Sequence, residues 1–160
     1  MAIHDDGVLR QAGEGPAVSY LGITTTFKLV ARESAGGISV VEFTTPPGPA
    51  PGPPAHTHPH AETFYVLDGR MALLVGSERV EVGAGGFAFA PGGVVHTFAN
   101  AGSTPARFLT IFTPAGFEAF FEEVVHLFQS STGGPPDMTA VAALAAKYHQ
   151  VAVGPPLHVT

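Results

Sequence analysis

Short runs of β-branched and aromatic residues, separated by Gly, Asp or Asn every seven to twelve residues, dominate the sequence between residues 62 and 113. The runs read ETFYVLDG, RMALLVG, ERVEVGAG, GFAFAPGG, VVHTFAN and ARFLTIFT. Such runs with regularly spaced turn residues are typical of an antiparallel sandwich or barrel. Residues 20–31 and 38–45 predict two further strands. The proline-rich stretch 46–54 predicts an extended connector, because proline lacks the N–H that a helix or a central strand needs.

The hydrophobic pattern changes to a helical period after Thr113. Apolar residues there recur at i, i+3, i+4, i+7, i+8 and i+11, namely Phe117, Phe120, Phe121, Val124, Val125 and Phe128. Residues 137–151 are rich in alanine and begin with Asp137, a favourable N-cap, so they predict a second helix. We therefore expect three parts: an N-terminal arm over residues 1–19, a β-barrel over 20–113, and a helical extension over 114–160 that packs on the barrel.

Charge and cysteine content exclude several classes of function. The net charge is -6, with 7 Lys+Arg that form no basic stripe, so nucleic acid is not an expected partner. No cysteine is present, which removes thiolate metal sites and cysteine nucleophiles. Residues 82–106 contain no Lys, Arg, Asp or Glu, but Gly, Pro, His and Asn interrupt them too often for a membrane span. The N-terminus carries acids where a signal peptide is basic and apolar, so we expect a cytoplasmic protein.

The stretch HTHPHAE, residues 56–62, places three imidazoles and one carboxylate in seven positions. His56, His58 and Glu62 are all even-numbered, and residues of equal parity share one face of a strand. Two imidazoles and a carboxylate suit Ni, Fe, Mn, Co, Cu or Zn, whereas Ca and Mg prefer oxygen ligands alone. His60 has the same parity, so parity does not exclude it. It follows Pro59, however, and our favoured interpretation is that it faces solvent or supports the site.

Two spaced patterns resemble the paired motifs of the cupins. The first is H-x-H-x3-E-x6-G, which runs from His56 to Gly69. The second is G-x5-P-x-G-x2-H-x3-N, whose fixed positions are Gly85, Pro91, Gly93, His96 and Asn100. The first motif usually opens with a glycine at the position of Ala50, which is the one departure. The resemblance covers residues 38–112 strongly.

This resemblance implies an all-β fold, a double-stranded β-helix or jelly-roll barrel, followed by the two C-terminal helices. It also implies that His56, His58, Glu62 and His96 hold one divalent transition metal near the open mouth of the barrel. His96 lies on a separate strand, so closure of the barrel assembles the set. Four such ligands leave one or two coordination positions open for water, oxygen or substrate, as catalytic metal sites do.

Phenylalanines make up most of the predicted barrel interior, which indicates an apolar cavity. Phe64 shares the parity of the ligands and Phe98 that of His96, so these two are the first candidates to touch a substrate. Phe87 and Phe89 are further candidates for the pocket. Tyr65 has the other parity and is expected to face away.

Among cupins, HTHPHAETFYVLDG and the helical tail look like the bacterial single-domain group related to quercetin 2,3-dioxygenase. That likeness implies a metal-dependent dioxygenase that cleaves or oxidises a small, apolar, flavonol-like aromatic with O2. Glu62 would then be both a ligand and the base that removes the proton of the substrate hydroxyl. A homodimer is also expected, since cupins are often dimers.

Two other functions fit the same residues. One is a metal-dependent cyclase, isomerase or lyase without redox chemistry, acting on a polyketide-like or other aromatic compound. The other is a cupin that binds a small ligand without catalysis. Fold likeness alone does not choose among these, because one fold hosts many chemistries.

Overall fold

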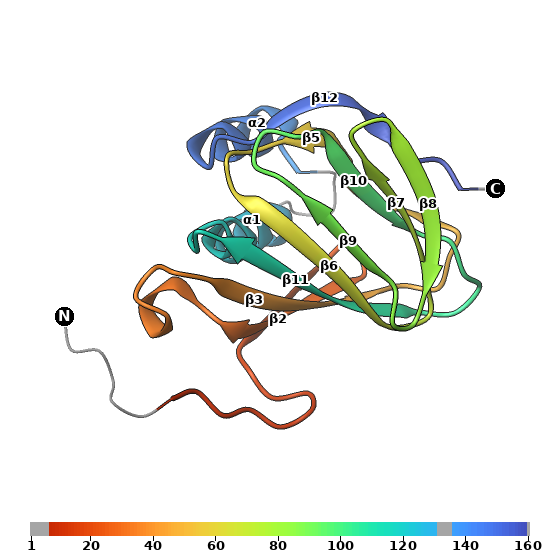
Figure 1. Ribbon diagram of the computed structural model, residues 1–160. Coiled ribbons are helices and arrows are strands. Elements are labelled where there is room, and N and C mark those ends of the chain that lie inside the picture. The colour runs from red at the N-terminus through yellow and green to blue at the C-terminus, as the bar shows by residue number, and fades with distance from the viewer. Residues whose placement is uncertain (1–6, 131–135, 160) are drawn as a thin grey trace.

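Two antiparallel sheets face one another in the computed structural model, which describes residues 7–130 and 136–159 (Figure 1). The first sheet has the order β1 (Ala17–Tyr20), β2 (Ile23–Leu29), β3 (Ser39–Thr45), β11 (Ala106–Thr113), β6 (Ala61–Asp68) and β9 (Phe87–Ala90). The second has the order β12 (Val151–Pro156), β5 (Pro54–Thr57), β10 (His96–Asn100), β7 (Arg70–Val75) and β8 (Glu78–Gly83), with β4 (Ala50–Pro51) also paired to β10. The chain crosses between the sheets repeatedly, and the predicted jelly-roll is confirmed.

Alternation along the central strands of the first sheet separates the core from solvent. In β6, Glu62, Phe64 and Val66 are buried, whereas Tyr65 is exposed, as the parity argument predicted. The neighbouring strands β3 and β11 show the same period of two. Their inward side chains meet those of β7 and β10 in one core, to which the strands contribute the phenylalanines Phe27, Phe43, Phe64, Phe98, Phe108 and Phe112.

The two helices lie at one end of the sandwich (Figure 1). Helix α1 (Glu118–Gln129) buries the apolar stripe that the sequence predicted, while α2 (Met138–Lys147) packs on α1 and has no fully buried residue. The predicted cap of α2 is confirmed, because the Asp137 side chain accepts a hydrogen bond of 2.9 Å from the Thr139 N–H. A single 3₁₀ turn, η1 (Ala31–Glu33), joins β2 to β3.

The C-terminal strand β12 corrects the predicted extent of the second helix. The helix ends at Lys147 rather than at residue 151, and His149 has a left-handed φ of 57° that redirects the chain. Residues 151–156 then pair with β5. Val151 and Val153 are exposed, so their apolar character does not mark a buried face, and the sequence gives no clear sign of this strand. At the other end, pairing begins at Ala17, inside the segment predicted as an arm.

Among the described residues, no helix has the length and apolar character that crossing a bilayer requires.

Thr110 is expected to lower the stability of the protein. Its side chain is 0% exposed on β11, and among the described residues its hydroxyl has no hydrogen-bond partner. Thr110→Val removes that hydroxyl at equal shape, so the free energy of unfolding should rise by about 1 kcal/mol. Thr97 is the matched control, because its hydroxyl donates to the Pro53 carbonyl at 2.7 Å. Thr97→Val should instead lower that free energy by about 1 kcal/mol. Urea unfolding measures both changes, and equal effects from the two variants would contradict the assignment.

Candidate metal centre

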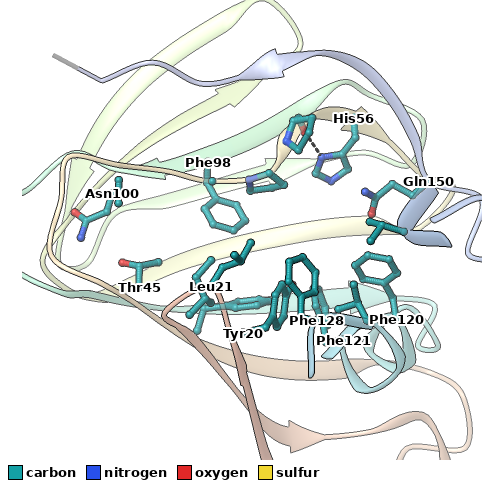
Figure 2. A pocket seen from close by; sticks show the side chains of 18 of the residues that line it. Tyr20, Leu21, Thr45, His56, Phe98, Asn100, Phe120, Phe121, Phe128 and Gln150 are labelled. Carbon is teal, nitrogen blue, oxygen red and sulfur yellow. Dashed lines mark hydrogen bonds between the residues drawn. The ribbon is translucent and has the colours of Figure 1, made fainter. Parts of the chain in front are cut away.

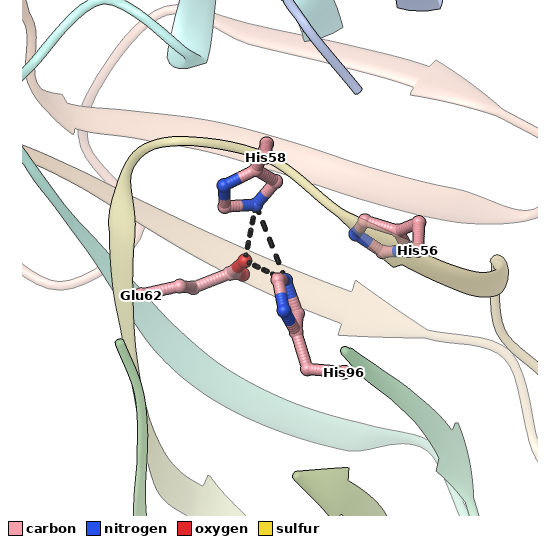
Figure 3. Close-up of side chains that lie close together, drawn as sticks. All are labelled: His56, His58, Glu62 and His96. Atoms are coloured by element: carbon pink, nitrogen blue, oxygen red, sulfur yellow. Dashed lines mark hydrogen bonds and ion pairs between the residues drawn. The ribbon is translucent and has the colours of Figure 1, made fainter. Parts of the chain in front are cut away.

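His56 and His96 face the same space because their strands are paired residue against residue. His96, the first residue of β10, is the direct antiparallel partner of His56 in β5, and directly opposed residues project to one face of a sheet. Glu62 projects from β6 in the other sheet, and His58 lies just after β5, where the chain crosses from the second sheet to the first. The predicted ligands therefore come from both walls of the sandwich (Figure 3).

The four side chains are buried and close together. Each offers one ligand atom, and those atoms all lie within 4.8 Å of one another. The Glu62 Oε2 atom is 3.0 Å from Nε2 of His58 and 2.8 Å from Nε2 of His96. The two Nε2 atoms are themselves 3.2 Å apart. Of the residues that the structure describes, these are the ones that form a cluster of metal-ligating type, and the sequence predicted the same set.

A backbone carbonyl fixes the orientation of each imidazole. The Nδ1 atoms contact the carbonyl oxygens of Pro54, His60 and Val94, at 2.7 Å for His56, 3.0 Å for His58 and 2.8 Å for His96. A carbonyl can only accept, so each Nδ1 carries a proton and each ring directs its Nε2, the atom that could bind a metal, toward the cluster. Metal-binding histidines are usually held in this way. Three imidazole nitrogens and one carboxylate oxygen at these distances form a donor set that fits a transition metal.

Burial and the neighbouring charges set the pKa values within the cluster. Burial alone would raise the pKa of Glu62, but hydrogen bonds from His58 and His96 outweigh it and lower that pKa to about 2. Burial lowers the pKa of His56 to about 4. For His96, burial acts to lower the pKa, but the Glu62 carboxylate outweighs it and raises the pKa. At neutral pH the site therefore holds an ionised carboxylate and a neutral His56.

His60 lies outside the cluster, in agreement with the favoured interpretation. Its Nδ1 contacts the Pro114 carbonyl at 2.7 Å rather than the other ligands. Its own backbone carbonyl holds His58, so this segment supports the site through the main chain. The turn before β10 also contacts the segment that carries His58 and His60, because the Gly93 N–H donates a hydrogen bond of 2.7 Å to the His58 carbonyl. The two sequence motifs are thereby joined at His58.

The proline-rich connector, residues 46–54, needs a glycine at residue 52, two residues after residue 50, where the cupin motif usually has one. A Cβ at Gly52 would lie 1.9 Å from the Phe98 carbonyl oxygen, a distance that no side chain tolerates. Ala50 instead lies in β4 opposite Asn100, where alanine is accommodated. The departure from the motif at residue 50 therefore leaves the close approach of the connector to β10 intact.

A cavity of about 540 Å³ extends from the cluster between the sheets (Figure 2). His56 and Glu62 form part of its wall. Most of the remaining lining is apolar, as the sequence predicted, and much of it is aromatic. The aromatic lining residues are Tyr20, Phe43, Phe98, Phe117, Phe120, Phe121 and Phe128. The α1 side chains among these form the wall that faces the second sheet, so this helix helps to build the cavity.

The four phenylalanines predicted for the pocket occupy three different environments. Phe98 lines the cavity. Phe64 is buried, with its ring centroid 6.1 Å from that of His96, but it lies in the core beside the cavity and not on its surface. Phe87 and Phe89 are 61% and 50% exposed on β9 and do not line the cavity. The prediction for these two was wrong, because they pair with Tyr65 and Thr63 on the outward face of the sheet.

Sequence reasoning missed the contribution of the chain ends to this cavity. Tyr20 in β1, Met138 and Val141 in α2, and Gln150 before β12 all line it. The helical period located the apolar stripe of α1 but not the element that the stripe would cover. No sequence signal marks Gln150, whose position depends on the pairing of β12 with β5.

The cupin domain family model matches residues 41–112, the segment that contains all four clustered residues. Residues 41–112 form a cupin domain. Solved structures agree on the fold. An RmlC-like cupin from Shewanella frigidimarina is 19% identical with a TM-score of 0.60, covering 71% of this chain and 96% of that chain. A predicted oxalate decarboxylase from Thermotoga maritima is 20% identical with a TM-score of 0.58, covering 67% and 98%.

Two Streptomyces proteins show higher identity to this chain. The polyketide cyclase RemF from Streptomyces resistomycificus is 26% identical with a TM-score of 0.50, and the match covers 71% of this chain and 77% of that chain. An uncharacterized protein of Streptomyces coelicolor is 40% identical over 58 residues, which are 35% of this chain and 54% of that protein. The match thus spans about half the length of that relative.

Metal affinity is expected to rise with pH until His96 loses its proton. A proton on His96 competes with a metal ion, and the raised pKa holds this proton above the ordinary imidazole value of about 6.5. Below that pKa, apparent affinity should rise about tenfold per pH unit, and above it the curve should flatten. His56 adds nothing to this slope above pH 6, because its pKa is about 4. Zinc titrations against a competing chelator measure the slope, and a constant affinity between about pH 5.5 and 8 would contradict it.

Proposed function

We propose that this cupin is a metal-dependent dioxygenase of the quercetinase-like type, which binds an apolar aromatic compound through an acidic hydroxyl group and oxidises it with O2. One observation carries the proposal: Glu62 belongs both to the ligand cluster and to the wall of the cavity. A compound that enters the cavity and reaches the cluster therefore meets an ionised carboxylate.

The two oxygens of Glu62 are suited to different tasks. Oε2 contacts His58 and His96, whereas Oε1 has no hydrogen-bond partner among the described residues. Oε1 can accept the proton of a substrate hydroxyl while Oε2 stays within the cluster. A transition metal held by His56, His58, Glu62 and His96 would supply Lewis acidity that makes such a hydroxyl more acidic and, if redox-active, would couple the substrate to O2.

The cavity matches the class of substrate proposed. Its volume of about 540 Å³ lies within the usual range for sites that enclose small organic ligands. Phe98 from β10 and Phe120 and Phe121 from α1 project into it from different walls (Figure 2). Aromatic walls on several sides favour a planar aromatic guest, since rings gain contact area and favourable stacking geometry. They also exclude water from the proton transfer.

Likeness to the polyketide cyclase RemF favours a second candidate function, a cyclase that acts without redox chemistry. In that reaction the same Glu62 would remove a proton next to a carbonyl of a polyketide-like substrate, and the apolar walls would fold the chain. Binding of a small ligand without catalysis is the third alternative.

Oxygen consumption with quercetin tests the proposal. Protein loaded with one metal at a time (Ni, Fe, Mn, Co, Cu or Zn) is mixed with quercetin in an oxygen electrode and, in parallel, under anaerobic conditions. The proposal predicts loss of the flavonol together with O2 in at least one metal form and no turnover without O2. Conversion of a polyketide-like substrate at equal rates with and without O2 would favour the cyclase. Binding without conversion in every metal form would favour the non-catalytic alternative.

A further inference from the structure

Polar side chains are few in the cavity wall, so each can be accounted for. They are Tyr20, Thr45, His56, Glu62, Asn100 and Gln150. The Thr45 hydroxyl donates to the Ala106 carbonyl at 3.2 Å and accepts from the Ala106 N–H at 3.3 Å. Thr45 therefore has no hydrogen-bonding capacity that a ligand would need to satisfy.

Asn100 is likewise occupied by the protein. Its amide N–H groups donate to the carbonyls of Pro46 and Thr104 at 2.9 and 2.8 Å, and its oxygen accepts from the Gly102 N–H at 2.8 Å. His56 and Glu62 belong to the metal cluster. Among the described lining residues, only the Tyr20 hydroxyl and the Gln150 amide remain without a hydrogen-bond partner.

Gln150 is held in place by its backbone rather than by its side chain. Its N–H donates to the Ala145 carbonyl at 2.9 Å, just after the left-handed His149. The next two residues pair with β5, and Ala152 is the direct partner of His56. This arrangement brings the Gln150 side chain into the cavity near His56 (Figure 2).

An unpaired amide beside the cluster has a chemical consequence. The amide offers two N–H donors and one carbonyl acceptor, and it is only partly exposed. A ligand that covers it without a matching polar group removes its water and leaves it unsatisfied, which disfavours binding. A ligand with a hydroxyl or carbonyl group at that point forms the missing hydrogen bond.

We infer that Gln150 is a specificity-determining residue of this cavity, and that its amide selects aromatic ligands bearing a second hydroxyl or carbonyl group beyond the group that meets the cluster. This inference rests on the proposed function, because it assumes an aromatic guest anchored at the metal. It narrows the proposed substrate class from apolar aromatics in general to aromatics that carry a second hydroxyl or carbonyl group.

Binding of two flavonols to metal-loaded protein without O2 tests the inference. Quercetin carries hydroxyl groups on both ends of its ring system, whereas 3-hydroxyflavone keeps only the hydroxyl and carbonyl that would meet the cluster. Wild-type protein should bind quercetin more tightly than 3-hydroxyflavone, by roughly tenfold or more. Gln150→Leu should remove most of this preference by weakening quercetin binding and tightening 3-hydroxyflavone binding, with metal content and thermal midpoint unchanged. Met138→Leu, which alters an apolar lining residue, should keep the preference.

The possible outcomes distinguish a failure of the role given to Gln150 from a failure of the proposed function. Equal quercetin affinity in wild type and Gln150→Leu overturns the role of Gln150 and leaves the proposed function in place. A weakened affinity in Gln150→Leu together with no O2 consumption in any metal form supports Gln150 and overturns the dioxygenase. Failure of wild-type protein to bind quercetin at all contradicts both.

Discussion

His96→Ala should lose most of the metal that the wild-type protein binds. His96 is the one clustered residue that comes from β10, and its Nε2 faces both His58 and Glu62. Without it, the remaining ligands come from residues 56–62 alone. We expect affinity to fall by more than about 100-fold, the upper end of what loss of a supporting partner costs. Metal-to-protein ratios after dialysis against buffer without chelator measure the change.

His60→Ala is the matched control for this loss. Its ring lies 6.0 Å from that of His58, centroid to centroid, yet it contacts Pro114 and stays outside the cluster. This variant should retain metal at the wild-type level, which shows that the effect of His96→Ala is not a general consequence of removing an imidazole near the site. Near-stoichiometric metal in His96→Ala would contradict the ligand assignment.

Glu62→Gln should retain more metal than His96→Ala but lose turnover. The amide oxygen can take the place of Oε2 in the cluster, while the amide cannot accept the substrate proton as the ionised Oε1 does. We expect kcat to fall by about 10²- to 10⁴-fold, the usual contribution of a positioned base. Loss of flavonol absorbance under air, normalised to bound metal, gives the value.

Glu42→Gln serves as the control, since Glu42 is a carboxylate of the same sheet that pairs with Arg107 away from the cavity. Its turnover should match that of the wild type. If Glu62→Gln keeps kcat within about threefold of the wild type, the proton goes to another group and the role given to Glu62 is wrong.

The strands and helices could be predicted because their patterns depend on residues near one another in the chain, whereas the full ligand set, which includes the distant His96, followed from the resemblance to the paired cupin motifs. Alternation along β6 placed Glu62 and Phe64 inside and Tyr65 outside, and the structure agrees. The helical stripe of α1 and the Asp137 cap also depend on residues near one another in the chain. The homodimer and the cytoplasmic location stay predictions.

The cavity wall could not be predicted in the same way, because it depends on which elements meet in space. Parity placed Phe87 and Phe89 on one face of β9, but only the register of β9 against β6 shows that this face points outward. Gln150 enters the cavity through pairing of β12 with β5, about a hundred residues earlier in the chain. Such contacts leave no periodic mark in the sequence.

A crystal of this protein soaked in Ni²⁺ and measured at the nickel absorption edge tests the central claim most directly. We expect one strong anomalous peak between the two sheets, roughly 2.0–2.2 Å from Nε2 of His56, His58 and His96 and from a carboxylate oxygen of Glu62. An anomalous peak elsewhere, or none at this position while the four side chains remain clustered, would contradict it.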